Sequence, residues 1–162
     1  MHKITINLWF DDQAEEAARF YTSIFKNSQI GRITYYGEDG HEVHGQKAGT
    51  AMTVEFELEG QPFVGLNGGS QFQFNESISF IVDCEDQDEV DYYWEKLGEG
   101  GDPAAQQCGW LKDRYGVSWQ IVPTALIEMV NDPDQEKVQR MLNTMYPMKK
   151  LDIAVLEKAF SG

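Results

Sequence analysis

The stretch that decides the fold is Ile4-Thr5-Ile6-Asn7-Leu8-Trp9-Phe10-Asp11-Asp12, which leads into a helical pattern from Gln13 to Phe25. Later in the chain, Ser77-Ile78-Ser79-Phe80-Ile81-Val82-Asp83 leads into a second helical pattern from Glu85 to Leu97. A strand, an acidic turn and an amphipathic helix therefore occur twice. Such a repeat predicts two packed copies of one supersecondary unit.

The rest of the first copy alternates between apolar and polar residues, as strands do. We expect strands at Gln29 to Tyr36, Thr50 to Leu58 and Pro62 to Leu66, with a polar loop from Gly37 to Gly49. Asn67-Gly68-Gly69-Ser70 ends this half. The order strand, helix and three strands makes a βαβββ module over residues 1–69.

The second copy is shorter, and a helical tail follows it. We expect strands at Gln107 to Lys112 and Val117 to Val122, with a fourth strand short or absent near Ala104 to Gln106. Beyond Pro123 the pattern is helical: Asp132 and Pro133 open a helix to about Met145, and a last helix runs from Lys150 to Phe160. The expected fold class is α+β. Residues 1–123 form one domain of two βαβββ modules (1–69 and 76–123), and residues 124–162 form a C-terminal helical extension.

Composition excludes several classes of partner. The chain has 162 residues and a net charge of −14, whereas nucleic acids and anionic membranes bind basic surfaces. We expect neither as a partner, and no apolar run is long enough to cross a bilayer. A start that leads directly into a strand predicts no signal peptide and a cytoplasmic location. Cys84 and Cys108 lack CxxC spacing, which favours free thiols over a disulfide.

The chain resembles the PhnB-like branch ("3-demethylubiquinone-9 3-methyltransferase domain") of the vicinal oxygen chelate, or glyoxalase/bleomycin-resistance, superfamily. The resemblance covers nearly the whole chain and implies tandem βαβββ modules that form one curved mixed sheet. The residues that carry it are Leu8-Trp9-Phe10-Asp11, Ala14-Glu15-Glu16-Ala17, Phe20-Tyr21, Leu66-Asn67-Gly68-Gly69, Cys108-Gly109-Trp110, Asp113, Gly116, Trp119-Gln120-Ile121-Val122-Pro123, Asp132-Pro133-Asp134, Met148-Lys149-Lys150 and Leu151-Asp152-Ile153.

Metalloenzymes of this superfamily hold a divalent ion in the cup of the sheet, with a common ligand pattern of His, Glu, His and Glu. The corresponding positions here are Thr5, Gly65, Ser77 and Gln120. Neutral hydroxyl and amide groups, and a residue without a side chain, cannot balance the charge of a dication. We therefore expect no catalytic metal and no cofactor. A methyltransferase of the nucleotide-cofactor type needs a glycine-rich turn between its first strand and its first helix. Here that turn is Asp11-Asp12-Gln13, so the sequence does not support the methyltransferase label.

Strand alternation gives a set of polar side chains, with one large aromatic ring, that would face the cup. Such a set suits a pocket that forms hydrogen bonds with an organic ligand. The predicted ligand-binding residues are Thr5, Asn7, Trp9, Asn67, Ser77, Ser79, Ser118 and Gln120. The alternative is a sheet face covered by solvent or by a second copy of the chain.

Other residues with reactive side chains have simple structural interpretations. Cys108 is a weak candidate for catalysis, and we expect a buried, inert thiol. Asp113 is a second weak candidate, and its position before Tyr115 and Gly116 favours a turn-shaping acceptor. His41 and His44 lie in the long polar loop, which favours solvation over metal binding.

Three hypotheses follow. The first is a homodimeric protein that binds a small organic molecule in its cup without a catalytic metal. The second is an enzyme for a small carbonyl or quinone-like substrate, in which Asn67, Ser77 or Gln120 polarises an oxygen and Cys108 or Asp113 handles a proton. The third is an assembly protein that uses its acidic surface and helical tail.

Overall fold

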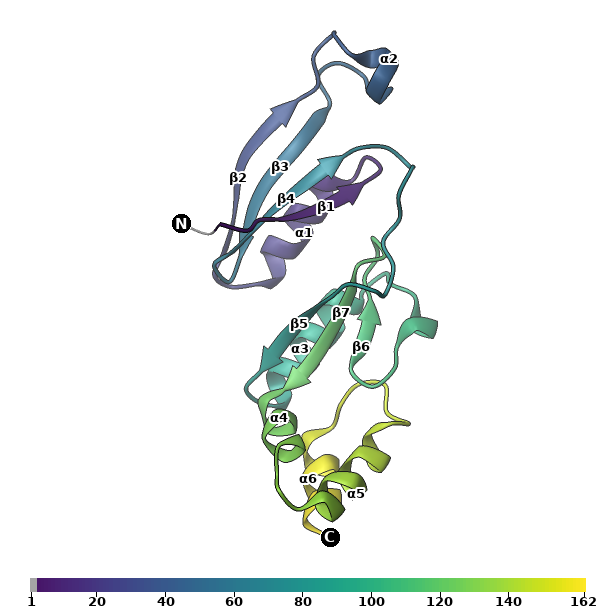
Figure 1. Ribbon diagram of the computed structural model, residues 1–162. Helices are drawn as coiled ribbons and strands as arrows, with labels where there is room; N and C mark the ends of the chain where they lie inside the picture. Colours follow the sequence, from purple (N-terminus) through teal and green to yellow (C-terminus); the bar gives the residue numbers. More distant parts are fainter. Residues whose placement is uncertain (1–2) are drawn as a thin grey trace. The chain divides into compact units, whose positions relative to one another are not determined.

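The computed structural model describes residues 3–162, which form two compact units that divide between Phe74 and Asn75. Each unit contains one mixed β-sheet with a helix packed on one of its faces (Figure 1). The helical tail belongs to the second unit. The two units, called the N-unit and the C-unit below, are described separately.

The N-unit contains a four-stranded sheet in the order β1-β4-β3-β2. Strand β1 runs parallel to β4, and the other neighbours are antiparallel. The elements are β1 (Ile6–Phe10), α1 (Ala14–Ile24), β2 (Ser28–Tyr35), α2 (His41–His44), β3 (Ala51–Leu58) and β4 (Gln61–Asn67).

The apolar stripe of α1 explains the core of the N-unit. Ala14, Ala17, Ala18, Tyr21 and Ile24 recur at helical spacing, and all five are buried. They pack on the buried residues of the sheet: Leu8, Phe10, Val54, Phe56, Leu58 and Phe63. The small alanines allow the helix to lie close to the strands.

The C-unit contains a three-stranded sheet in the order β5-β7-β6. Strand β5 runs parallel to β7, and β6 runs antiparallel to β7. The topology therefore repeats part of the N-unit sheet. The elements are β5 (Ser79–Cys84), α3 (Gln87–Gly98), the 3₁₀ helix η1 (Pro103–Ala105), β6 (Trp110–Lys112) and β7 (Ser118–Pro123).

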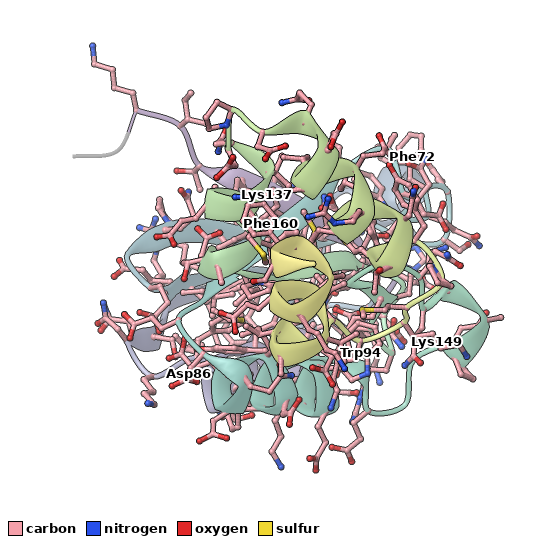
Figure 2. The ribbon with its side chains drawn as sticks, turned by 90° about the horizontal axis from the view of Figure 1, so that it is seen from below. Phe72, Asp86, Trp94, Lys137, Lys149 and Phe160 are labelled. Atoms are coloured by element: carbon pink, nitrogen blue, oxygen red, sulfur yellow. The ribbon has the colours of Figure 1, made fainter. Side chains whose placement is uncertain are left out.

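Three helices follow β7: α4 (Thr124–Val130), α5 (Gln135–Met145) and α6 (Ile153–Ser161). They share a small core of Leu126, Met129, Met141, Leu151 and Leu156. At the contact of α5 with α6, Lys137 Nζ lies 5.7 Å from the centre of the Phe160 ring (Figure 2). The tail therefore has an apolar interior of its own.

Main-chain hydrogen bonds attach the tail to the rest of the C-unit. The amides of Cys108 and Gly109 donate to the carbonyls of Met148 and Lys149, both at 2.8 Å. On α3, the side chain of Gln87 donates to Leu151 O (3.1 Å) and accepts from the amide of Ile153 (2.9 Å). These bonds satisfy backbone groups of the segment between α5 and α6 and the amide of Ile153, the first residue of α6, which has no partner within its own helix.

The predicted order of elements agrees with the observed one, with differences at particular residues. Residues 41–44 of the expected loop form the short helix α2, and η1 lies where the fourth strand of the second module was uncertain. Helix α5 begins later than expected, because the Asp134 carboxylate accepts from the amides of Glu136 and Lys137 and so caps it in place of Asp132.

Candidate functional site

We call the side of each sheet that points away from its own helix the distal face. In the N-unit, alternation places Thr5, Asn7 and Trp9 on this face, opposite to the buried Leu8 and Phe10. The pairing of β1 with β4 and of β4 with β3 adds Val64 and Glu55 to the row of Asn7. The polar side chains of the N-unit sheet thus gather on one side.

A hollow of about 300 Å³ lies on this distal face. Its polar lining comes from Thr5, Gln29, Glu55 and Glu57, and Val64 and Pro62 give it an apolar side. The Glu55 carboxylate accepts from Arg32 at 2.7 Å, at a position where both side chains are well exposed. The hollow presents mainly oxygen acceptors.

Sequence reasoning did not select Gln29, Glu55 or Glu57. A signal was present, since β3 alternates between the buried Val54, Phe56 and Leu58 and the less buried residues between them. Alternation along β3 therefore places Glu55 and Glu57 on the same side as Thr5.

Trp9 and Asn7 lie on the predicted side of the sheet. The indole Nε1 of Trp9 donates to the carbonyl of Gly69 at 2.8 Å, and its ring makes an edge contact with Phe72 at 5.0 Å. Trp9 is therefore held in place by the segment after β4. The side chain of Asn7 is exposed.

Asn67 lies on the opposite side from the one we expected. Its Oδ1 accepts from the amide of Ala14 at 2.8 Å and its Nδ2 donates to Ala51 O at 3.0 Å, so the side chain caps α1 and ties it to β3. It is 5% exposed and pairs with Phe10, which also faces the helix. The alternation of β4 had been assigned one residue out of phase.

The four positions that the superfamily would use for a metal carry none of its usual ligands here, since they are Thr5, Gly65, Ser77 and Gln120. A Cβ at Gly65 would lie 3.1 Å from the Cβ of Ala14, so this position faces α1 and not the distal face. Ser77 precedes β5, and its amide donates to Asn75 Oδ1 at 2.9 Å. Within residues 3–162, no three His, Cys, Asp or Glu side chains lie close enough to hold a metal ion. A glycine and three neutral side chains do not fit a catalytic dication.

In the C-unit, the structure brings three of the predicted residues together on the distal face. Gln120 Nε2 donates to Ser79 Oγ at 2.9 Å. Ser118 is the direct neighbour of Ser79 across β5 and β7, and Lys112 is its neighbour across β6 and β7. Lys112 was not among the predicted site residues.

Ser118 has an unusual environment for a hydroxyl group. Its residue is 2% exposed, and its Oγ has no hydrogen-bond partner within the described part of the chain. Buried polar atoms without partners are rare in folded proteins.

The Lys112 ammonium forms an ion pair with the exposed Glu76, and this hydrogen bond lowers the pKa of the Glu76 carboxyl.

Asp113 holds the turn between β6 and β7. Its Oδ1 accepts from the amides of Tyr115 (2.8 Å) and Val117 (3.1 Å), and its Oδ2 accepts from Trp119 Nε1 at 2.8 Å. The carboxylate is buried, and both of its oxygens are engaged. The expectation of a turn-shaping acceptor is confirmed.

The two cysteines are free and differ in environment. Cys84 is fully buried, and desolvation with help from Glu89 and other acids raises the pKa of its thiol to about 12. Cys108 is half-buried, and its Sγ donates to Tyr146 O at 3.0 Å at the end of α5. The thiol of Cys108 thus takes part in docking the tail.

The two histidines of α2 stay apart from the sheet faces. His44 Nδ1 accepts from the amide of Gln46 at 3.0 Å, and its ring lies 4.4 Å from the ring of Tyr36. His41 is exposed, as predicted for a solvated loop, whereas these contacts hold the half-buried His44 against Tyr36.

Comparisons with known proteins agree with this geometry. Residues 2–122 match the family model described as 3-demethylubiquinone-9 3-methyltransferase. A PhnB protein from Bacillus cereus, described with the same name, is 36% identical over 75% of this chain and 99% of its own, with a TM-score of 0.65. The chain belongs to this PhnB-like family. Residues 123–162, which include all three tail helices, lie beyond the family match.

More distant structures share only the fold with this PhnB-like chain. A protein from Pseudomonas aeruginosa is 15% identical over 76% of this chain and 98% of its own, with a TM-score of 0.57. The fosfomycin resistance protein FosX from Listeria monocytogenes is 18% identical over 81% and 98%, with a TM-score of 0.50. The fold is that of the vicinal oxygen chelate superfamily. No curated protein matches the sequence.

The family's description names a methyltransferase, but the β1–α1 turn of this chain differs from that of a nucleotide-type cofactor site. Such sites place a glycine-rich turn and the free N-terminus of a helix against the cofactor. Here the turn is Asp11-Asp12-Gln13, and the Asn67 side chain caps the helix. Among residues 3–162, no helix has the length and apolar character needed to cross a bilayer.

Proposed function

We propose that this PhnB-like protein binds a small polar organic molecule on the distal face of its N-unit sheet, without a catalytic metal. The observation that carries the proposal is the hollow of about 300 Å³ on the N-unit sheet, with its polar lining of Thr5, Gln29, Glu55 and Glu57. This volume lies at the lower end of the range for small-molecule sites. The occupant is therefore a metabolite-sized compound and not a polymer.

The chemistry of the lining supports a ligand that carries hydrogen-bond donors. Carboxylates accept hydrogen bonds, and the hydroxyl and amide groups beside them can accept or donate. Val64 and Pro62 supply an apolar surface for a carbon skeleton. None of these polar side chains forms part of the apolar core under α1.

Native mass spectrometry of the gently purified full-length chain, with elemental analysis of the same sample, tests the proposal. We expect a retained organic mass and no stoichiometric transition metal. Glu57→Gln should weaken retention of that compound by about tenfold, because it replaces a charged acceptor. The matched control, Glu157→Gln, makes the same change on α6.

A stoichiometric metal, or a sample free of any adduct that also fails to bind compounds extracted from cells, would overturn the proposal. The same spectra measure the mass of the complex. The proposed homodimer should appear at twice the chain mass. The expected cytoplasmic location accompanies the proposal and is tested by cell fractionation.

A further inference from the structure

The distal face of the C-unit carries a row of hydrogen-bond donors, of which the fold uses only a part. Three residues form a row across the three strands, here called the serine–lysine row: Ser79 on β5, Ser118 on β7 and Lys112 on β6. Neighbouring strands are about 4.8 Å apart, so the three Cα atoms span roughly 10 Å. One group of a small ligand can contact all three side chains.

The central member of the row lacks a partner in the folded chain. Ser118 Oγ is buried and forms no hydrogen bond within residues 3–162. A buried hydroxyl without a partner destabilises the protein, because it has lost its bonds to water. A bound acceptor would remove this cost.

The flanking residues also point to an acceptor. Ser79 Oγ accepts from Gln120 Nε2, so Ser79 can donate its own hydroxyl hydrogen. The Lys112 ammonium carries three N–H donors, and an exposed carboxylate, that of Glu76, already binds there. An acidic oxygen thus occupies the end of the row in the structure.

The buried residues of the same strands confirm which way the row faces. Leu111 and Trp119, which alternate with Lys112, Ser118 and Gln120, are buried. Trp119 donates to the buried Asp113, and Leu111 lies near the end of α3. The polar row therefore points away from α3.

We propose that the serine–lysine row is a separate binding site of the C-unit, which takes an oxyanion: a carboxylate or phosphoryl group. The site lies within the C-unit and goes beyond the proposed function of the N-unit hollow. Ser79 and Ser118 donate through their hydroxyl groups, and Lys112 supplies the positive charge. The exposed carboxylate of Glu76 gives way to the ligand or shares the ammonium with it.

The probes are sodium acetate and inorganic phosphate, added to the ¹⁵N-labelled full-length chain at a constant ionic strength of about 0.15 M. At this ionic strength the net charge of −14 is screened beyond about 8 Å. We expect saturable shifts of the amide signals of Ser79, Lys112 and Ser118, which sodium chloride does not reproduce.

Two variants and one control assign the effect. Ser118→Ala and Lys112→Met should each weaken binding about tenfold or more, because a hydrogen bond to a charged group is lost. Lys26→Met removes the same charge from an exposed position in the N-unit and should leave binding unchanged. Ser118→Ala should also keep or raise the unfolding midpoint, since it deletes an unpartnered hydroxyl; a merely structural serine would lower it.

Equal affinity in the wild type and in Ser118→Ala would overturn the inference, and so would shifts that chloride reproduces. If Lys112→Met fails to fold, Ser118→Ala alone decides. A retained organic adduct together with no saturable anion shifts would sustain the proposed function while refuting the oxyanion site. Absence of both adduct and anion binding would refute both.

Discussion

The two sheets share a topology and differ in the chemistry of their distal faces. The N-unit presents oxygen acceptors around a hollow, with Glu55 and Glu57 at its centre. The C-unit presents donors, with Lys112 and two serines in one row. A repeated backbone fixes where side chains point, and the substitutions on that backbone decide what each copy can bind.

The two units also differ in how they complete their structure. The N-unit closes with its own fourth strand, β2. The C-unit has η1 near the corresponding point and gains the tail, whose carbonyls receive the amides of Cys108 and Gly109. The shorter copy is thus completed by residues that lie beyond the family match.

The largest expected effect concerns two glycines, one in each unit, that leave too little room for a Cβ atom. A Cβ at Gly101 would lie 2.0 Å from the carbonyl oxygen of Lys112, whereas a Cβ at Gly68 would lie 2.2 Å from the Trp9 ring. A backbone atom cannot move as a ring can, so Gly101→Ala should destabilise the C-unit by more than about 3 kcal/mol and Gly68→Ala the N-unit by about 1–2 kcal/mol. Hydrogen exchange that resolves peptides of each unit measures both, and equal losses would contradict this difference.

The next effect tests whether the tail is part of the C-unit core. Leu151 is 1% exposed and belongs to the tail core. Leu151→Ala should cost about 3 kcal/mol, because it removes buried methyl groups and leaves a cavity. Urea unfolding with hydrogen exchange should locate the loss in residues 75–162. The exposed Val155→Ala is the control, with an expected change below about 0.5 kcal/mol.

A mirrored pair of substitutions compares the polar anchor of each unit. Asp113→Asn keeps the oxygen that accepts from two backbone amides but turns a donating NH2 group toward Trp119 Nε1–H, and should cost about 2 kcal/mol. Asn67→Asp removes the donor to Ala51 but places a carboxylate at the start of α1, which the helix dipole favours, so about 1 kcal/mol is expected. A larger loss for Asn67→Asp in unit-resolved hydrogen exchange would reverse the assigned importance of these anchors.

The smallest effect concerns the ion pair on the C-unit face. The hydrogen bond from Lys112 lowers the pKa of Glu76 below its ordinary value of 4.5. The pair therefore stabilises the folded state above that value, and the contribution disappears as the pH falls through the lowered pKa. Lys112→Met should raise the pKa of Glu76 toward 4.5 in a ¹³C NMR titration of its carboxyl carbon. Lys26→Met should leave it unchanged.

Much of the fold could be predicted from periodicity and from the repeat. The stripe of α1 and the alternation of β1 and β3 are strong signals, because one face of each is buried. The start of β5 was harder to place. Asn75 accepts from the amide of Ser77, so the strand begins at Ser79, and such a local side-chain bond leaves no periodic pattern.

The candidate site could be predicted only in part. Ser79, Ser118 and Gln120 were found because β5 and β7 alternate regularly over their length. Asn67 was predicted on the distal face, but it caps α1 on the other side of the sheet. Alternation alone cannot tell whether a polar residue at the end of a strand faces outward or caps a neighbouring helix. The partnerless state of Ser118 depends on atoms from three strands, and no local sequence pattern shows it.

The bonds that span each unit also have a consequence for protein synthesis. In the N-unit, α1 is capped by Asn67, 53 residues after Ala14, and in the C-unit α3 binds the tail through Gln87, which is 66 residues before Ile153. A growing chain folds in the order of its synthesis, so each helix leaves the ribosome well before its partner segment. The entropic cost of closing a loop rises only slowly with its length. The loops of 53 and 66 residues therefore have similar closure costs. Translation should therefore deliver two successive folding events of comparable difficulty, one after Asn67 emerges and one after Ile153.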